Sequence, residues 1–201
     1  MTSLPIIMYN VIMAKKWFGV VGRNGSGKST VCEYLVSKGY TIFSLSDIVR
    51  NHAKAQDLSL DRDTLTQLAN QLKTEHGIDY FAREVYENAV KMASPLIVFD
   101  SIRHPSEIDY LRSCDVTFVG VHASLKDCYD RINRRGKGTD FVSFEEFERQ
   151  DNYEMNGQSF GQMISTCIEM CDFNVKNNGD LRNLYDQVDD MLIAKDDADV
   201  K

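Results

Sequence analysis

The sequence contains little cysteine and little proline, and neither is arranged as a framework. There are 5 cysteines and 3 prolines in 201 residues. An odd number of cysteines without a compact spacing argues against a disulfide scaffold and fits a reducing compartment. We therefore expect a cytoplasmic protein whose fold depends on an apolar core.

Metal-binding patterns are also missing. Cys167 and Cys171 have the i, i+4 spacing of one helix face, but no histidine or second cysteine pair lies near them in the sequence. The chain has 4 histidines, and no two of them form a pair. We expect no zinc site, and we interpret the two cysteines as small apolar residues of the core.

No apolar run is long enough to cross a membrane. The N-terminal segment 4–13 is apolar, but it is shorter than a bilayer-spanning helix and has no positive region before it. We expect neither a signal peptide nor an anchor here, and we treat residues 1–15 as an N-terminal extension. Met13 as the natural start of the protein is a hypothesis that N-terminal sequencing would test.

An excess of positive charge is absent as well. The 23 basic residues are outnumbered by 30 acidic ones, which gives a net charge of -7. This balance argues against a protein that holds nucleic acid through nonspecific phosphate contacts, so any anion site must be local. With 43% apolar and 26% charged residues, we expect one globular domain, as a monomer or a small homo-oligomer, without nucleic-acid or membrane partners.

The sequence does contain a complete phosphate-binding motif. The pattern G-x-x-x-x-G-K-[ST] begins at Gly22, after an apolar run and before an amphipathic segment. Its glycines let successive backbone N–H groups point at one anion, while Lys28 would reach the β- and γ-phosphates and the Ser29 hydroxyl would bind Mg²⁺. The candidate triphosphate-binding residues are Gly22, Asn24, Gly25, Ser26, Gly27, Lys28, Ser29 and Thr30.

Short apolar runs alternate with helical patterns, which predicts an α/β fold. Strands of a parallel sheet are expected at 18–21, 41–43, 96–99, 116–121 and 172–176. Residues 44–92 hold helical patterns without an obvious strand between them, so we expect an appended helical flap. A closing helix is expected through residue 191, and the acidic end, 195–201, is expected to be frayed.

A carboxylate ends the most apolar of these strands. Four continuous apolar residues, Leu96 to Phe99, are followed directly by Asp100. Because ligands bind at the carboxyl ends of parallel strands, we expect Asp100 to face the same crevice as the phosphate-binding motif and to contact magnesium through water. The alternative interpretation is an aspartate that caps the next turn.

Several helix starts can be predicted from capping residues. Ser124 and Ser143 each begin a capping box, and Asp79 is placed to cap a third helix. After Ser143 the chain is expected to be helical to residue 170, with interruptions near Gly157 and Gly161. Between the two boxes lies a basic cluster that is conspicuous in an acidic protein, made up of Arg131, Arg134, Arg135 and Lys137 around Gly136 and Gly138.

Taken together, these segments resemble the P-loop kinases of the nucleoside-monophosphate-kinase superfamily from about residue 16 to residue 192, within a single expected kinase domain at 16–194. The resemblance implies a three-layer α/β/α fold with a five-stranded parallel sheet, an acceptor-binding helical insertion at about 44–92 and a lid at about 131–153. The chain also resembles dephospho-coenzyme A kinases and poorly characterised archaeal and phage-type kinases. The segments that carry the resemblance are GSGKSTV at 25–31, GY at 39–40, SDIVR at 46–50, FDSIRHPSE at 99–107, DRINRR at 130–135 and ERQDN at 148–152.

The resemblance implies roles for five arginines. Arg50 and Arg103 match the arginines that grip the acceptor's phosphate, and Arg131 matches a lid arginine that lies against the donor base. Arg135 and Arg149 match those that neutralise the transferring phosphoryl group. Planar guanidinium groups suit this task because they bind two phosphate oxygens at a time.

The sequence also departs from the adenylate-kinase pattern. Ser101 stands where the family has glycine, and residues 102–104 replace its Phe-Pro-Arg, so the identity of the acceptor cannot be transferred. The region Gln158–Gln162 has no counterpart that we can align.

Three functions remain open at this point. The first is an ATP- and Mg²⁺-dependent kinase that acts on a nucleoside or deoxynucleoside monophosphate. The second is a dephospho-coenzyme A kinase, whose hydroxyl acceptor would need Asp47 as a general base. The third is a nucleotide-binding sensor that transfers nothing. The DxxR arrangement of Asp100 and Arg103 favours a phosphate acceptor, and the retained lid arginines speak against a sensor.

Overall fold

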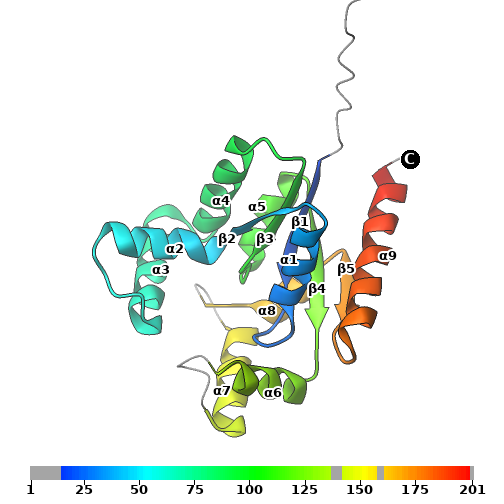
Figure 1. The fold of residues 1–201 in the computed structure, drawn as a ribbon. Helices are drawn as coiled ribbons and strands as arrows, with labels where there is room; N and C mark the ends of the chain where they lie inside the picture. Colours follow the sequence, from blue (N-terminus) through cyan, green and yellow to red (C-terminus); the bar gives the residue numbers. More distant parts are fainter. Residues whose placement is uncertain (1–14, 137–141, 158–160, 200–201) are drawn as a thin grey trace, which may run out of the picture.

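The computed structural model describes residues 15–136, 142–157 and 161–199. In this part of the chain, strands and helices alternate as the sequence predicts (Figure 1). The strands are β1 (Lys16–Val21), β2 (Thr41–Ser44), β3 (Leu96–Asp100), β4 (Val116–His122) and β5 (Phe173–Lys176). The helices are α1 (Lys28–Ser37), α2 (Leu45–Ala55), α3 (Arg62–His76), α4 (Tyr80–Lys91), α5 (Pro105–Ser113), α6 (Leu125–Arg135), α7 (Phe144–Met155), α8 (Ile164–Glu169) and α9 (Leu181–Asp199).

The strands form one parallel sheet in the order β2-β3-β1-β4-β5, which confirms the predicted five-stranded sheet. Ser44 at the end of β2 pairs in register with Asp100 at the end of β3. At the end of β1, Val21 pairs with Gly120 of β4. The carboxyl ends of these strands therefore meet at one edge, where the phosphate-binding loop (residues 22–27) follows β1.

Helices cover both faces of this sheet, because successive side chains of a strand point in opposite directions. Phe18 and Val20 of β1 belong to a core that includes the buried faces of α1 and α9. Trp17 and Val21 of the same strand belong to a second core that includes residues of α2, α3, α4, α5 and α8. This is the three-layer α/β/α architecture that the sequence predicts.

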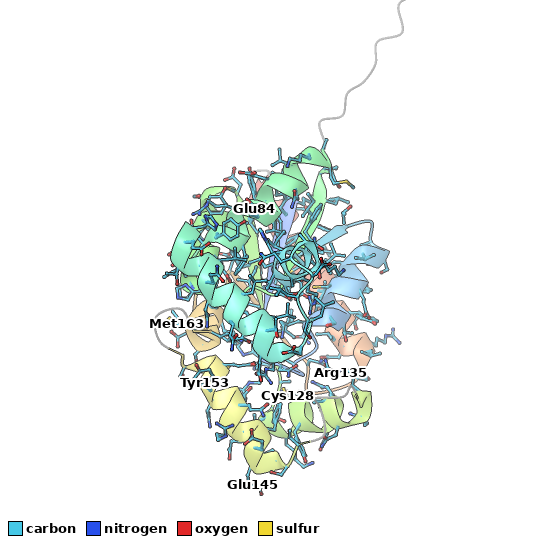
Figure 2. All side chains as sticks on the ribbon, turned by 90° about the vertical axis from the view of Figure 1, so that its left-hand side faces the viewer. Glu84, Cys128, Arg135, Glu145, Tyr153 and Met163 are labelled. Carbon is cyan, nitrogen blue, oxygen red and sulfur yellow. The ribbon has the colours of Figure 1, made fainter. Side chains whose placement is uncertain are left out.

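Two groups of helices extend beyond the layered core. Helices α2, α3 and α4 connect β2 with β3 and lie to one side of the sheet (Figure 1). Helices α6 and α7 lie together beyond the carboxyl end of β4 and share a small apolar cluster of Cys128, Ile132 and Phe147. Figure 2 shows this end of the molecule from another side, with Cys128 and Arg135 marking α6 and Glu145 marking the start of α7. The acceptor-binding and lid roles of these groups stay predictions.

The helix starts agree with the sequence at two of three expected caps. Ser124 Oγ accepts from the backbone N–H of Asp127 at 3.0 Å, and Ser143 Oγ accepts from that of Glu146 at 3.2 Å. The expected cap at Asp79 is wrong. Its side chain caps no N–H group of α4 and instead accepts a hydrogen bond from the guanidinium of Arg83.

The end of the chain also differs from expectation. Helix α9 continues to Asp199 instead of fraying from residue 195, and the carboxylate of Asp196 pairs with the ammonium group of Lys16 at the start of β1.

The uninterrupted part of α7 stops at Met155, and α8 starts only at Ile164. The predicted positions Lys137, Gly138 and Gln158 lie outside the described residues. None of the described helices combines the length and the apolarity that a membrane crossing needs.

Candidate functional site

The phosphate-binding loop has a backbone shape that depends on its glycines. Gly25 and Gly27 have φ angles of +78° and +103°, in the left-handed region that favours glycine. A Cβ atom at Gly22 would lie 2.6 Å from the carbonyl oxygen of Val121, and one at Gly25 would lie 2.5 Å from that of Cys128. Side chains are therefore excluded at these positions, which lets the backbone amides come close to an anion.

Lys28 is the first residue of α1, so its ammonium group belongs to the positive end of that helix. Its Nζ donates to the carbonyl oxygen of Arg23 at 2.9 Å. Burial, followed by the charge of Arg103, holds the pKa of Lys28 below its usual value, while Asp100 and Glu154 act in the opposite direction. A phosphate bound here would therefore meet two cations that the fold has brought close together.

Two buried oxygen atoms at this site have no hydrogen-bond partner among the described residues. They are Oγ of Ser26 in the loop and Oδ1 of Asp100 at the end of β3. Buried polar atoms are nearly always paired, so these two indicate that a further group binds here. Together with the exposed hydroxyl of Ser29 in the first turn of α1, they fit a triphosphate with Mg²⁺.

No cluster of three or more His, Cys, Asp or Glu side chains suited to a metal occurs in the described part of the chain. A magnesium site on a phosphate-binding loop does not need such a cluster. Mg²⁺ is usually held by one or two protein oxygens, by water and by the phosphates of the nucleotide.

Serine hydroxyls connect the ends of β2 and β3. Ser44 Oγ lies 2.9 Å from Ser46 Oγ and donates to Ser101 Oγ at 3.1 Å. Ser101 Oγ lies in turn 3.4 Å from Oδ2 of Asp100. Ser101 has a φ angle of +67°, in the left-handed region that favours glycine, the residue that the resemblance implies at this position. Here the serine side chain belongs to a polar group beside the predicted magnesium ligand.

The backbone of Arg103 is fixed by a buried carboxylate. Oε2 of Glu107, which is 3% exposed, accepts from the N–H groups of Arg103 and His104 at 2.8 and 3.1 Å. The Nζ atom of Lys73 in α3 lies 3.9 Å from the other oxygen of Glu107. The guanidinium of Arg103 is exposed, and its charge acts on Lys28. The loop after β3 therefore holds the backbone of this arginine in place at the end of a strand that neighbours β1, and its expected contact with the acceptor stays a prediction.

Arg50 and Asp47 lie together near the start of α2. Nη1 of Arg50 donates to Ser46 Oγ at 2.5 Å and to Asp47 Oδ1 at 3.1 Å. The side chain of Asp47 is 62% exposed. An exposed pair of this kind contributes little stability, so both side chains are available to a ligand.

Arg131 contacts the protein backbone at the phosphate-binding loop. Its Nη2 donates to the carbonyl oxygen of Asn177 at 2.6 Å, and its Nη1 lies 3.4 and 3.5 Å from the carbonyl oxygens of Gly25 and Ser26. The described contacts of this side chain are thus with the loop and with Asn177. The expected contact with the donor base stays a prediction.

The two remaining arginines are placed differently from Arg103. Arg135 is the exposed last residue of α6 (Figure 2). Arg149 donates through Nε and Nη2 to the carboxylate of Glu146, at 2.8 Å each, and its side chain is 73% exposed. Neutralisation of a transferring phosphate by these two residues stays a prediction. Arg149 also lines a cavity of about 380 Å³ between α3 and α7, together with Arg62, Asp63, Gln150 and Tyr153.

Sequence reasoning missed two contacts between α7 and the rest of the site. Nη1 of Arg23 in the loop lies 3.2 Å from Oδ2 of Asp151. One turn later, Glu154 pairs with Arg62 of α3 at 2.8 Å. An arginine inside the phosphate-binding motif of an acidic protein is a signal that could have found Arg23. No local pattern marks Asp151, because its partner is remote in the sequence.

Asn177 was missed as well. It is 5% exposed, and its Nδ2 donates to the carbonyl oxygen of Ser26 at 2.9 Å. Its own backbone N–H donates to the carbonyl oxygen of His122 at 2.7 Å. Asn177 directly follows β5, so the rule that functional residues gather at the carboxyl ends of parallel strands could have found it.

Comparisons with known proteins show the family of this chain. A family model described as an AAA domain matches residues 19–152. A UPF0200 protein of Hyperthermus butylicus is 31% identical over 147 residues, which cover 73% of this chain and 78% of the relative. Another, from Thermococcus kodakarensis, is 30% identical over 166 residues, covering 80% and 87%. The chain spans 57% of a longer UPF0200/UPF0201 protein of Archaeoglobus fulgidus, at 25% identity over 188 residues.

Solved structures share the fold at low sequence identity. TT1252 from Thermus thermophilus has a TM-score of 0.64 at 19% identity, over 90% of this chain and 98% of that chain. A shikimate kinase from Acinetobacter baumannii has a TM-score of 0.57 at 12% identity, over 94% and 98%. A dephospho-CoA kinase from Campylobacter jejuni has a TM-score of 0.55 at 15% identity, over 91% and 98%. The chain therefore belongs to the family of this AAA-domain model and of the UPF0200 proteins, and its fold is that of the P-loop kinases.

Proposed function

We propose that this protein is an ATP- and Mg²⁺-dependent kinase that transfers the γ-phosphate to a nucleoside or deoxynucleoside monophosphate. The observation that carries the proposal is that two cations from different segments follow neighbouring strands. Lys28 begins α1 directly after the phosphate-binding loop that follows β1, and Arg103 follows β3, which pairs with β1. Burial and, after it, the charge of Arg103 lower the pKa of Lys28. Transfer of a phosphoryl group from one phosphate to another is favoured when one cation binds the donor phosphates and a second cation binds the acceptor phosphate.

Phosphoryl transfer to a phosphate requires few other catalytic groups from the protein. The acceptor phosphate is already an anion, so positioning and charge stabilisation replace a general base. Lys28 and the loop amides would hold the donor phosphates, and Arg103 would hold the acceptor phosphate, with Arg50 as a second contact. Mg²⁺ bound at Ser29 and Asp100 would supply further charge neutralisation.

A dephospho-coenzyme A kinase is the alternative that one observation favours. Asp47 follows β2 at the same sheet edge as Asp100, and its carboxylate is largely exposed. A hydroxyl acceptor must lose a proton, and an exposed carboxylate at this edge is placed to accept it. Arg103 argues for the phosphate acceptor, because a ribose hydroxyl offers no charge for a guanidinium to bind.

The proposal is tested by an assay of ADP release with Mg²⁺ and ATP. The acceptors are all nucleoside and deoxynucleoside monophosphates and dephospho-coenzyme A, tested one at a time. We expect one monophosphate or a small group of them to stimulate release, and Lys28→Ala to abolish the stimulation. Stimulation by dephospho-coenzyme A alone would replace the proposal with its alternative. ATP binding without stimulation by any acceptor would indicate a sensor, and ADP release that no acceptor changes would indicate an ATPase.

A further inference from the structure

We propose that Arg131 and Asn177 position the phosphate-binding loop from outside its cradle, and that Arg131 supports the donor's phosphates through the loop and makes no contact with the donor's base. The inference rests on the proposed function only in taking the loop to bind a triphosphate. It assigns Arg131 a role different from the one that family resemblance implies.

The peptide groups of the phosphate-binding loop point in two directions. When the N–H groups of a loop point inward at an anion, carbonyl groups of the same loop point outward and need donors of their own. The carbonyl oxygen of Ser26 accepts from Nδ2 of Asn177 at 2.9 Å and lies 3.5 Å from Nη1 of Arg131. The carbonyl oxygen of Gly25 lies 3.4 Å from the same Nη1. The two side chains thus provide donors to the outer side of the loop.

Asn177 and helix α6 pack closely against the phosphate-binding loop. A Cβ atom at Gly27 would lie 2.1 Å from Nδ2 of Asn177, so the asparagine side chain lies directly against the loop. A Cβ atom at Gly25 would lie 2.5 Å from the carbonyl oxygen of Cys128, which is three residues before Arg131 on α6. Cys128 and Arg131 lie on one face of α6, and this face touches the loop at Gly25 through Cys128 and at Gly25 and Ser26 through Arg131.

Arg131 and Asn177 are also hydrogen-bonded to each other. Nη2 of Arg131 donates to the carbonyl oxygen of Asn177 at 2.6 Å, and the N–H of Asn177 donates to His122 at 2.7 Å. Asn177 is thereby fixed to the end of β4 on one side and to α6 on the other. A guanidinium is suited to this position because its several donors can serve three carbonyl groups while its charge adds to the positive potential of the loop.

The experiment compares two probes that share phosphates but not a base. Binding of ATP and of inorganic tripolyphosphate, each with Mg²⁺, is measured by calorimetry on the full chain and on Arg131→Gln. If Arg131 supports the loop, we expect the affinities of Arg131→Gln for ATP and for tripolyphosphate to fall by a common factor of about ten, because charge-assisted contacts are lost in each case. Arg131→Lys keeps the charge and one donor group, so we expect a smaller common loss.

Lys126→Gln is the matched control. It removes one positive charge from α6, and the Lys126 side chain is 78% exposed and pairs with Asp130 on the same helix. We expect both affinities to stay at the wild-type value in this variant. Thermal unfolding without ligand establishes that each variant is folded.

Loss of ATP affinity with tripolyphosphate affinity unchanged would overturn the proposal in favour of a base contact, and no loss with either probe would overturn it as well. Asn177→Asp decides the same question if Arg131→Gln does not fold. It replaces the Nδ2 donor with an oxygen that faces the carbonyl of Ser26, so we expect the same common loss. A wild-type protein that binds neither probe would overturn the kinase proposal together with this one. A protein that binds both probes but phosphorylates no acceptor would overturn the kinase proposal alone.

Discussion

Arg23 in the phosphate-binding loop and Asp151 in α7 form an ion pair, with Nη1 of the arginine 3.2 Å from Oδ2 of the aspartate. The carboxylate is buried, and burial raises its pKa against the opposing influence of Arg23. A second carboxylate of α7, Glu154, acts on the pKa of Lys28. Helix α7 therefore brings negative charge to the cations that are expected to meet phosphates.

Asp151→Asn should tighten ATP binding, because Arg23 loses a counter-charge that competes with the phosphates. We expect the dissociation constant to fall by about threefold to tenfold, the size of one partly screened charge interaction. Calorimetry with Mg²⁺ and ATP measures it. Glu148→Gln, which removes an exposed carboxylate from the same helix, is the control and should leave the constant unchanged. Weaker ATP binding in Asp151→Asn would show that the pair holds the loop in its binding shape.

Lys28 should take up protons when the triphosphate binds at alkaline pH. Burial and the charge of Arg103 hold the pKa of Lys28 in the free protein below its usual value, so a larger fraction of this side chain is neutral at alkaline pH than of an exposed lysine. Bound phosphates favour the charged form and raise the pKa again. Calorimetry in buffers of different ionisation enthalpy at about pH 9 to 10 should show uptake of a fraction of one proton per ATP.

Lys28→Ala should abolish both this proton uptake and phosphoryl transfer. Lys38→Ala, at the opposite end of α1, removes an exposed lysine and should preserve both. Near-normal turnover in Lys28→Ala would remove the lysine from the phosphate site.

The part of the site that the sequence predicts is the part that local geometry determines. The motif from Gly22 to Thr30 specifies its own turn and the helix that follows. The place of Asp100 at the end of β3 could be predicted from the continuous apolar run before it, while its contact with magnesium stays a prediction. The sheet followed from the same apolar runs. In each case the decisive interactions involve neighbours in the sequence or a rule about strand ends.

One expectation failed for a local reason. Asp79 has the sequence context of a cap, yet its carboxylate accepts from Arg83 one turn later and from no backbone N–H group of α4. The other features that escaped prediction depend on partners that are distant in the chain. The acidic end of α9 stays helical where Asp196 pairs with Lys16. The environment of Arg131 depends on how α6 packs against the loop after β5. Such pairs are selected by tertiary packing, which a single sequence does not display.

Arg103→Ala should weaken the use of the acceptor and spare the donor. The guanidinium is exposed beside Lys28 while its backbone is held by Glu107, so the substitution removes the charge and leaves the loop in place. We expect kcat/KM for the acceptor to fall by about tenfold to a hundredfold with the KM for ATP within about twofold. Arg182→Ala, an exposed arginine at the start of α9, is the control. An unchanged acceptor profile would take Arg103 out of the site.

Asp47→Asn separates the two kinase chemistries. If the acceptor is a phosphate, no proton has to be removed, and Asp47 serves only to orient Arg50 across their 3.1 Å contact. We then expect kcat to fall by no more than about threefold, with a larger rise in the KM of the acceptor, since the asparagine keeps the shape but not the charge. If the acceptor is a hydroxyl, loss of the general base should lower kcat by about a hundredfold or more. Asp109→Asn, an exposed carboxylate on α5, controls for the change in net charge. A collapse of kcat in Asp47→Asn with the KM for ATP unchanged would therefore assign a hydroxyl acceptor, even though Arg103 stands where a phosphate clamp is expected.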